Sequence, residues 1–132
     1  GFTFPGSTAY VDVRDVANIA IELMEKSIFE NRFIITSENV KYKTISDKVR
    51  KAFGKSPVKI IPNAILDILP IFSTLLGWLI PILKLANKTN VETIKSDSKI
   101  TNQKIRETLN YEFIPIDESV DFHLKNYLSD RK

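Results

Sequence analysis

The run from Tyr10 to Ala17 constrains the fold more than any other stretch, because it joins a strand pattern to a helix pattern without a linker. It reads Tyr-Val-Asp-Val-Arg-Asp-Val-Ala. Apolar and polar residues alternate over the first four positions, which is typical of a half-buried strand. Asp15 is the expected cap of the helix that follows, since its carboxylate can accept a backbone N–H of the first turn. The expected buried stripe of that helix consists of Val16, Ala17, Ala20, Leu23 and Met24.

The charges of this joint have a structural interpretation. Asp15 is expected to fix the passage from strand to helix. Arg14 is expected to pair with Asp12, with Asp15 or with a carboxylate outside this chain. A joint of this kind is typical of the interior of a larger α/β enzyme.

Composition narrows the class of protein. The chain has 132 residues, 43% of them apolar and 27% charged, which suits one globular fragment able to bury a core. It has no cysteine, so disulfides and thiolate chemistry are excluded, and a cytoplasmic location is the default expectation. His123 is the only histidine, so it is interpreted as a surface or structural residue and no metal site is predicted. The net charge of +3 comes from interspersed signs, which argues against nucleic-acid binding.

The next segments alternate in type. Short strands are predicted at 32–36, which contains three consecutive apolar residues, and at 58–61. Between them, Thr44 is the expected cap of a helix that Gly54 ends in a left-handed conformation. These few strands cannot form a complete sheet, so their partners are expected elsewhere. The predicted fold is therefore an α/β, mostly helical fragment.

Residues 64–86 form the most apolar segment, and the sixteen residues from Ile68 to Leu83 carry no formal charge. Interruption by Pro70, Gly77 and Pro81 predicts two or three short helices. An apolar wall of a pocket or subunit contact is the favoured interpretation. The alternatives are a membrane span, for which the segment is too short and too interrupted, and attachment to a membrane surface, so a membrane partner is not expected. The candidate substrate-binding residues are Phe72, Leu76 and Trp78, with ordinary core packing as the competing interpretation.

The remaining chain predicts two helices. Asp97 or Ser98 is expected to cap the first, which would carry Ile100, Ile105 and Leu109 and end at a left-handed Asn110. The second is expected from about Asp117 to Leu128, after the break imposed by Pro115. Its expected buried stripe is Val120, Leu124 and either Tyr127 or Leu128.

Four motifs together carry a resemblance to a known family. They are the Tyr10–Ala17 run, Asn31-Arg32-Phe33-Ile34-Ile35, Ala52-Phe53-Gly54-Lys55 and the Leu109-Asn110-Tyr111 to Phe113-Ile114-Pro115 tail. Their order resembles the C-terminal half of extended short-chain dehydrogenases/reductases. This is the NAD-dependent epimerase/dehydratase family, with its dihydroflavonol-reductase-like members. The resemblance covers nearly the whole chain and implies the C-terminal strands and substrate-binding helices of a Rossmann-type enzyme.

The resemblance also implies what this chain lacks. The family holds its dinucleotide with a Gly-x-x-Gly-x-x-Gly turn and transfers protons with a Tyr-x-x-x-Lys pair. Neither motif occurs here, so no catalytic and no cofactor-binding residue is predicted. NAD or NADP is expected in the parent enzyme and none for this chain alone. The implied partner is the N-terminal Rossmann half, and a homodimer is compatible with the resemblance.

The expected function is therefore the substrate-binding portion of an NAD(P)-dependent oxidoreductase, epimerase or dehydratase, inactive by itself. Nucleotide-sugar epimerases of this family commonly place an Arg just before the strand to bind the diphosphate. The segment 6–9 has no Arg, which favours a smaller or more apolar substrate. The alternative is a self-standing binding or interaction module that uses residues 64–86 to hold a partner or a lipid.

Overall fold

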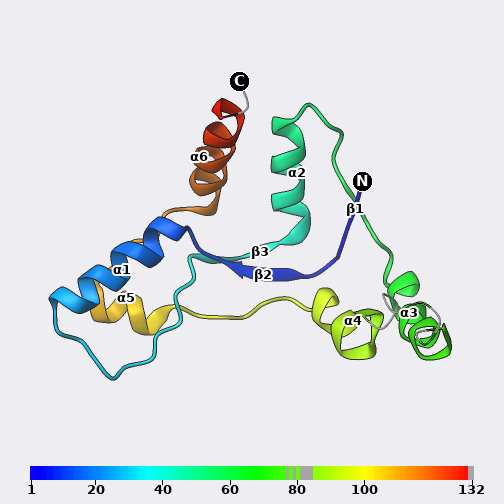
Figure 1. The fold of residues 1–132 in the computed structure, drawn as a ribbon, viewed down its shortest axis with the longest axis horizontal. Helices are drawn as coiled ribbons and strands as arrows, with labels where there is room; N and C mark the ends of the chain where they lie inside the picture. Colours follow the sequence, from blue (N-terminus) through cyan, green and yellow to red (C-terminus); the bar gives the residue numbers. More distant parts are fainter. Residues whose placement is uncertain (77, 79, 81–84, 131–132) are drawn as a thin grey trace. The chain divides into compact units, whose positions relative to one another are not determined.

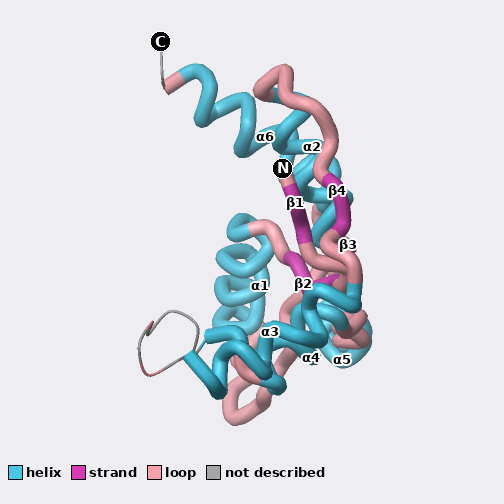
Figure 2. The backbone as a smooth tube through the Cα atoms, turned by 90° about the vertical axis from the view of Figure 1, so that its right-hand side faces the viewer, coloured by secondary structure: helices cyan, strands magenta, loops and turns pink. Residues whose placement is uncertain are grey.

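A computed structural model describes the chain except for Gly77, Leu79, residues 81–84 and residues 131–132, together with the side chain of Leu76. The described residues form an α/β structure that is 55% helical, with six helices, as predicted (Figure 1). Figure 2 shows how short the strands are beside the helices. The elements are β1 (Phe2–Thr3), β2 (Ser7–Tyr10), α1 (Val13–Glu25), β3 (Glu38–Lys41), α2 (Tyr42–Ala52), β4 (Lys59–Ile60), α3 (Asn63–Leu76), α4 (Lys88–Lys95), α5 (Gln103–Leu109) and α6 (Ile116–Ser129).

The strands pair two by two. β1 runs parallel to β4, with Phe2 opposite Lys59 and Thr3 opposite Ile60, and β2 pairs with β3. The strand predicted at 32–36 is wrong, because this segment is irregular and the strand follows it at β3. Phe33 and Ile35 are partly buried against the apolar core around Ile19. The apolar run at 33–35 therefore reflects burial in this core and not pairing in a sheet.

The chain divides into two compact units, each built from two separate segments. Unit 1 comprises Gly1–Thr8 and Lys41–Ser98. Unit 2 comprises Ala9–Val40 and Lys99–Lys132. The two units are described separately below.

The core of unit 2 lies where α1 meets α5 and the segment after it. Its buried residues are Ile19, Ile105, Leu109 and Phe113. Asn110 ends α5 with φ of 53° and ψ of 41°, which confirms the left-handed exit. The predicted cap at Asp97 or Ser98 is wrong, since α5 begins only after Asn102. The last helix is confirmed as α6, but Tyr127 and Leu128 are exposed, and its buried residues are Ile116 and Ser119.

The predicted buried stripe of α1 is wrong. Ile19 is the buried apolar residue of this helix and Leu23 is partly buried, whereas Val16 and Met24 are exposed. We define the α1 apolar stripe as the exposed residues Val13, Val16, Ala17, Ala20, Ile21 and Met24. The apolar residues of α1 form one broad arc that contains both Ile19 and the α1 apolar stripe, so helical spacing alone could not select which part of the arc is buried.

Unit 1 contains α2, α3 and α4. α2 is confirmed as a helix, and Gly54 follows its end with φ of 64°, as predicted. Thr44 does not cap α2, because the helix already begins at Tyr42 and has no side-chain cap. α3 continues through Pro70, contrary to the prediction of a break there, and contacts α4. The expected breaks at Gly77 and Pro81 lie outside the described residues.

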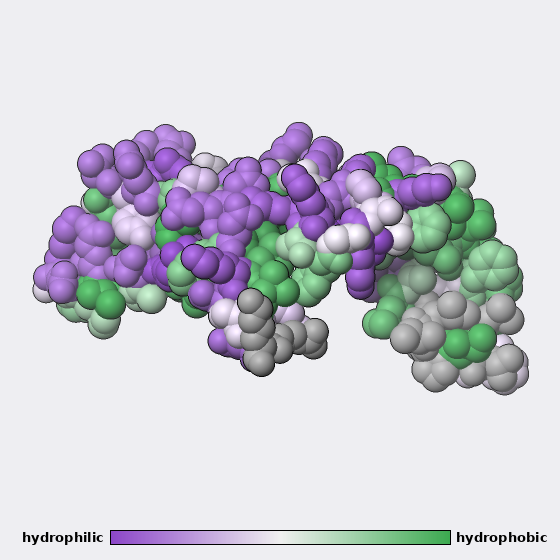
Figure 3. Space-filling model, turned by 90° about the horizontal axis from the view of Figure 1, so that it is seen from above, coloured by the Kyte–Doolittle hydropathy of each residue, from purple (hydrophilic) through white to green (hydrophobic). Residues whose placement is uncertain are grey.

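Apolar surface is abundant in unit 1. Figure 3 shows apolar residues gathered over α3, on the right in this view. The described residues contain no helix that is both long and apolar enough to cross a bilayer.

Gly6→Ala is expected to lower the free energy of unfolding by about 2–3 kcal/mol, because the added methyl group would meet two backbone oxygens. It would lie 2.3 Å from Ser96 O and 2.6 Å from Ile94 O. Gly54→Ala is the matched control: its Cβ has no atom within 4 Å, but its φ is +64°, so the expected cost is about 1 kcal/mol. Urea denaturation measures both, and equal costs would contradict the close approach at Gly6.

Candidate functional site

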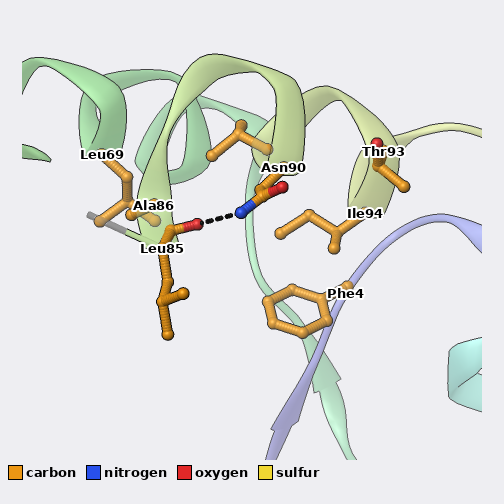
Figure 4. Close-up of a pocket in the computed structure, with 8 residues that line it drawn as sticks. Phe4, Leu69, Leu85, Ala86, Asn90, Thr93 and Ile94 are labelled. Atoms are coloured by element: carbon orange, nitrogen blue, oxygen red, sulfur yellow. Dashed lines mark hydrogen bonds between the residues drawn. The ribbon is translucent and has the colours of Figure 1, made fainter. Parts of the chain in front are cut away.

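An apolar pocket of about 440 Å³ lies in unit 1 and is the candidate binding site (Figure 4). It is formed by the segment after β1, by α3, and by α4 with the turn before it. The residues that line it are Phe4, Leu69, Leu85, Ala86, Asn90, Val91, Thr93 and Ile94. The volume fits a small organic molecule.

The sequence of α4 explains one wall of the pocket. Asn87 caps the helix by accepting the backbone N–H of Asn90 at 3.0 Å. Val91 and Ile94 are three residues apart and therefore share one face. An ion pair between Lys95 and Asp67 ties α4 to α3 below this face. The wall is thus held by a capped helix and by its contact with a neighbour.

The opposite wall depends on Phe4. The chain after Phe4 is bound to the end of α4, because Gly6 N donates to Ile94 O and Ser7 N donates to Ser96 O, each at 3.0 Å. The Phe4 ring also makes an edge contact with Tyr42, with ring centroids 6.3 Å apart. These contacts fix the aromatic ring beside Ile94, as Figure 4 shows.

The two polar side chains that line the pocket already donate hydrogen bonds to backbone oxygens of the protein. Asn90 Nδ2 donates to Leu85 O at 2.8 Å, and Thr93 Oγ1 donates to Thr89 O at 2.9 Å. Both donors are therefore engaged within the protein. None of the eight lining residues carries an ionisable side chain. The pocket can bind an apolar molecule, but its lining cannot transfer a proton.

Of the predicted substrate residues, Phe72 and Trp78 do not line this pocket. Phe72 is half exposed and Trp78 is 78% exposed, so both lie on the surface of unit 1. The side chain of Leu76 lies outside the described residues. Sequence reasoning found the right region with 64–86, which supplies Leu69, Leu85 and Ala86. It missed Phe4, because nothing local in the sequence indicates that this residue reaches α4.

A second constellation of polar residues lies in unit 2, at the joint between β2 and α1. The predicted cap is wrong by one helical turn: Asp12 is the cap of α1, and its Oδ1 accepts the backbone N–H of Arg14 at 2.8 Å. Asp15 lies inside the first turn. Asp12 and Asp15 are three residues apart, so either could have capped a helix in this region. In the structure the helix begins at Val13, which makes Asp12 the cap.

Asp12 is the better-connected of the two carboxylates. The Arg14 guanidinium binds it twice, from Nε at 3.0 Å and from Nη2 at 2.8 Å. His123 Nε2 lies 3.4 Å from Asp12 Oδ2. The hydrogen bonds from Arg14 hold the pKa of Asp12 well below its ordinary value, against the opposing effect of burial. Arg14 itself stacks over the Phe122 ring, 3.9 Å from the ring centroid. Of the three expected partners of Arg14, the structure therefore selects Asp12.

Asp15 connects α1 to the C-terminal part of the chain. Its side chain is fully buried and accepts from Tyr111 Oη at 2.9 Å and from the backbone N–H of Ile114 at 3.1 Å. Burial raises the pKa of the Tyr111 phenol, and its bond to Asp15 adds to this. Asp12 and Asp15 are both buried, so they hold the fold together and do not present themselves to a ligand.

Comparisons of the chain with protein-family models, with curated proteins and with solved structures gave no match in any of the three. Among the described residues, no three His, Cys, Asp or Glu side chains gather closely enough to hold a metal ion. The family resemblance thus stays a prediction from the sequence motifs.

Asp15→Ala is expected to cost about 3 kcal/mol of unfolding free energy, because it removes the acceptor of two buried donors. Asp15→Asn keeps an acceptor oxygen and is expected to cost less. Tyr111→Phe removes only one of the donors, so its cost is expected to be about 1–2 kcal/mol. Thermal and urea denaturation check these values. A cost for Asp15→Ala as small as that of a lost surface cap would show that the buried bonds contribute little.

The stability contributed by Asp12 is expected to be complete above about pH 4 and to decline as the pH falls below that value. In the folded chain the pKa of Asp12 is lowered, so the unfolded chain takes up this proton first. Urea denaturation at about pH 5 and about pH 3 compares the chain with Asp12→Asn. The variant should be less stable at the higher pH and lose less on acidification. A parallel loss in both proteins would contradict this expectation.

Proposed function

We propose that this chain is the substrate-binding portion of an NAD(P)-dependent oxidoreductase, epimerase or dehydratase of the extended short-chain dehydrogenase/reductase type. The single observation that carries this proposal is the apolar pocket, which can bind a small molecule but has no ionisable residue among its described lining residues. Catalytic groups and the dinucleotide would then come from a partner half with a Rossmann fold. The four sequence motifs named above supply the family.

The exposed α1 apolar stripe supports the proposal that a partner half packs against this chain. It leaves Val13, Ile21 and Met24 exposed on a helix whose other side is already packed on a core. Ala17 and Ala20 lie in the middle of the stripe, and such small residues allow another backbone to approach closely. An apolar face of this kind is the expected contact of a helix with a neighbouring layer of an α/β enzyme.

The described residues do not fit a dinucleotide by themselves. A pyrophosphate needs glycines that expose backbone N–H groups at the start of a helix. Gly6 is instead packed against the carbonyl oxygens of Ile94 and Ser96, and Gly54 follows the end of α2. No step of the reaction is therefore assigned to this chain. Its contribution would be to bind and orient the substrate.

The pocket also supports the class of substrate. Its lining is formed mostly by aliphatic and aromatic carbon, with Asn90 and Thr93 as the polar residues. A nucleotide-sugar would need cations for its phosphates, and the described lining residues include none. We therefore propose an apolar carbonyl or hydroxyl compound of modest size.

The proposal is tested by expressing the coding sequence upstream of Gly1 in frame with this chain. Expected are a glycine-rich turn, a Tyr-x-x-x-Lys pair and oxidation of NADH or NADPH by an apolar carbonyl compound, whereas calorimetry of the chain alone should show no cofactor binding. An upstream sequence without both motifs would contradict the proposal. Micromolar binding of NADH to the chain alone would do the same.

Ala20→Glu is expected to abolish this activity, because it places a charge in the middle of the α1 apolar stripe. The stability of the separate chain should change by less than about 0.5 kcal/mol, since Ala20 is exposed there. Lys125→Glu adds the same carboxylate to the exposed surface of α6 and serves as the control. Full activity of Ala20→Glu would show that this stripe is not covered by the partner half.

A further inference from the structure

α3 has a second apolar face besides the one that contacts α4. Leu66 is buried and Leu69 lines the pocket, and both are on the side of α4. A neighbouring arc of the same helix is exposed. We define the α3 apolar face as Ile65, Ile68, Ile71, Phe72 and Leu75, whose exposed fractions are 47–63%. Trp78 follows just beyond the helix and is the most exposed of the large apolar residues.

The α3 apolar face carries no uncompensated charge. Asp67 is the only ionisable residue between Asn63 and Leu76, and it is paired with Lys95 of α4. Figure 3 shows apolar residues gathered on the side of the molecule that carries α3. A contiguous apolar surface of this kind marks a contact with something other than water.

The unit that contains this face differs in net charge from the other unit. The two segments of unit 1 contain ten basic and four acidic residues, a net charge of +6. The segments of unit 2 contain nine basic and twelve acidic residues, a net charge of −3. The α3 apolar face therefore belongs to a cationic unit, which complements an anionic surface.

The α1 apolar stripe and the α3 apolar face differ in composition, and this difference indicates what each of them contacts. The α1 apolar stripe has two alanines and acidic neighbours such as Glu22 and Glu25, which suits close packing against protein. The α3 apolar face is made of large aliphatic and aromatic residues, with Trp78 at its end. Tryptophan and bulky apolar residues are typical of helices that lie in a membrane interface.

We propose that the α3 apolar face binds the surface of an anionic membrane, with α3 lying in the plane of the interface. A helix of 14 residues is about 21 Å long and cannot span a bilayer of about 30 Å. The large residues enter the boundary between headgroups and acyl chains, and the lysines of unit 1 attract the anionic headgroups. This inference is independent of the proposed function, because it uses neither the pocket lining nor the α1 apolar stripe.

Trp78 provides the measurement, because it is the only tryptophan of the chain and is largely exposed to water. The full chain is titrated with vesicles of phosphatidylcholine containing about 30% phosphatidylglycerol, and with vesicles of phosphatidylcholine alone. The emission maximum is expected to shift to shorter wavelength on the anionic vesicles. Their apparent affinity should exceed that of the neutral vesicles about tenfold and should fall in about 1 M salt.

Ile68→Ser combined with Leu75→Ser is expected to abolish the shift, since both side chains are exposed and the fold does not need them. Val13→Ser combined with Met24→Ser removes similar side chains from the α1 apolar stripe and should leave the shift unchanged. Circular dichroism verifies that both variants are folded. Absence of a shift on anionic vesicles, or its persistence in the α3 variant, would overturn the proposal. A shift without vesicles, accompanied by a dimer in light scattering, would assign the face to a second copy and overturn it as well.

Discussion

Two buried carboxylates at the start of α1, Asp12 and Asp15, need hydrogen-bond donors or cations, and the rest of unit 2 has to supply them. A charge removed from water is tolerated only where donors or cations replace the lost hydration. For Asp12 the replacement is mostly local, through Arg14. For Asp15 it comes from Tyr111 and Ile114, 96 and 99 positions further along the chain. The C-terminal part of the chain therefore has to return to α1, and α6 begins where that requirement has been met.

The same requirement explains how α6 is oriented against α1. Its residue Phe122 lies under the Arg14 guanidinium, and the neighbouring His123 faces the Asp12 carboxylate. Ile116 at the start of α6 is buried, but Val120 and Leu124 of the expected stripe are only partly buried. Charge and hydrogen bonding thus specify the position of this helix more than its apolar stripe does.

Local features of the structure could be predicted from the sequence, and features that depend on distant contacts could not. Gly54 and Asn110 were predicted correctly, because a left-handed residue after a helix is determined within one turn of chain. The buried side of α1 was not, because its apolar arc is broader than the part that is buried and the choice depends on α5. The pocket was located only in part: Leu69 lies in the apolar segment, whereas Phe4 reaches α4 through backbone bonds made by Gly6 and Ser7.

The interleaving of the two units has a consequence for synthesis on the ribosome. Unit 1 needs its first eight residues and then nothing beyond Ser98, so it can close while the C-terminal part is still being made. α1 is made before unit 1 is complete, but it cannot bury Ile19 or satisfy Asp15 until residues 105–114 have followed. The nascent chain therefore carries an unfinished amphipathic helix while residues 41–98 are being made, and such long-range contacts leave a chain exposed to aggregation. The segment Lys99–Lys132 therefore completes the fold of unit 2 after the rest of that unit has been made.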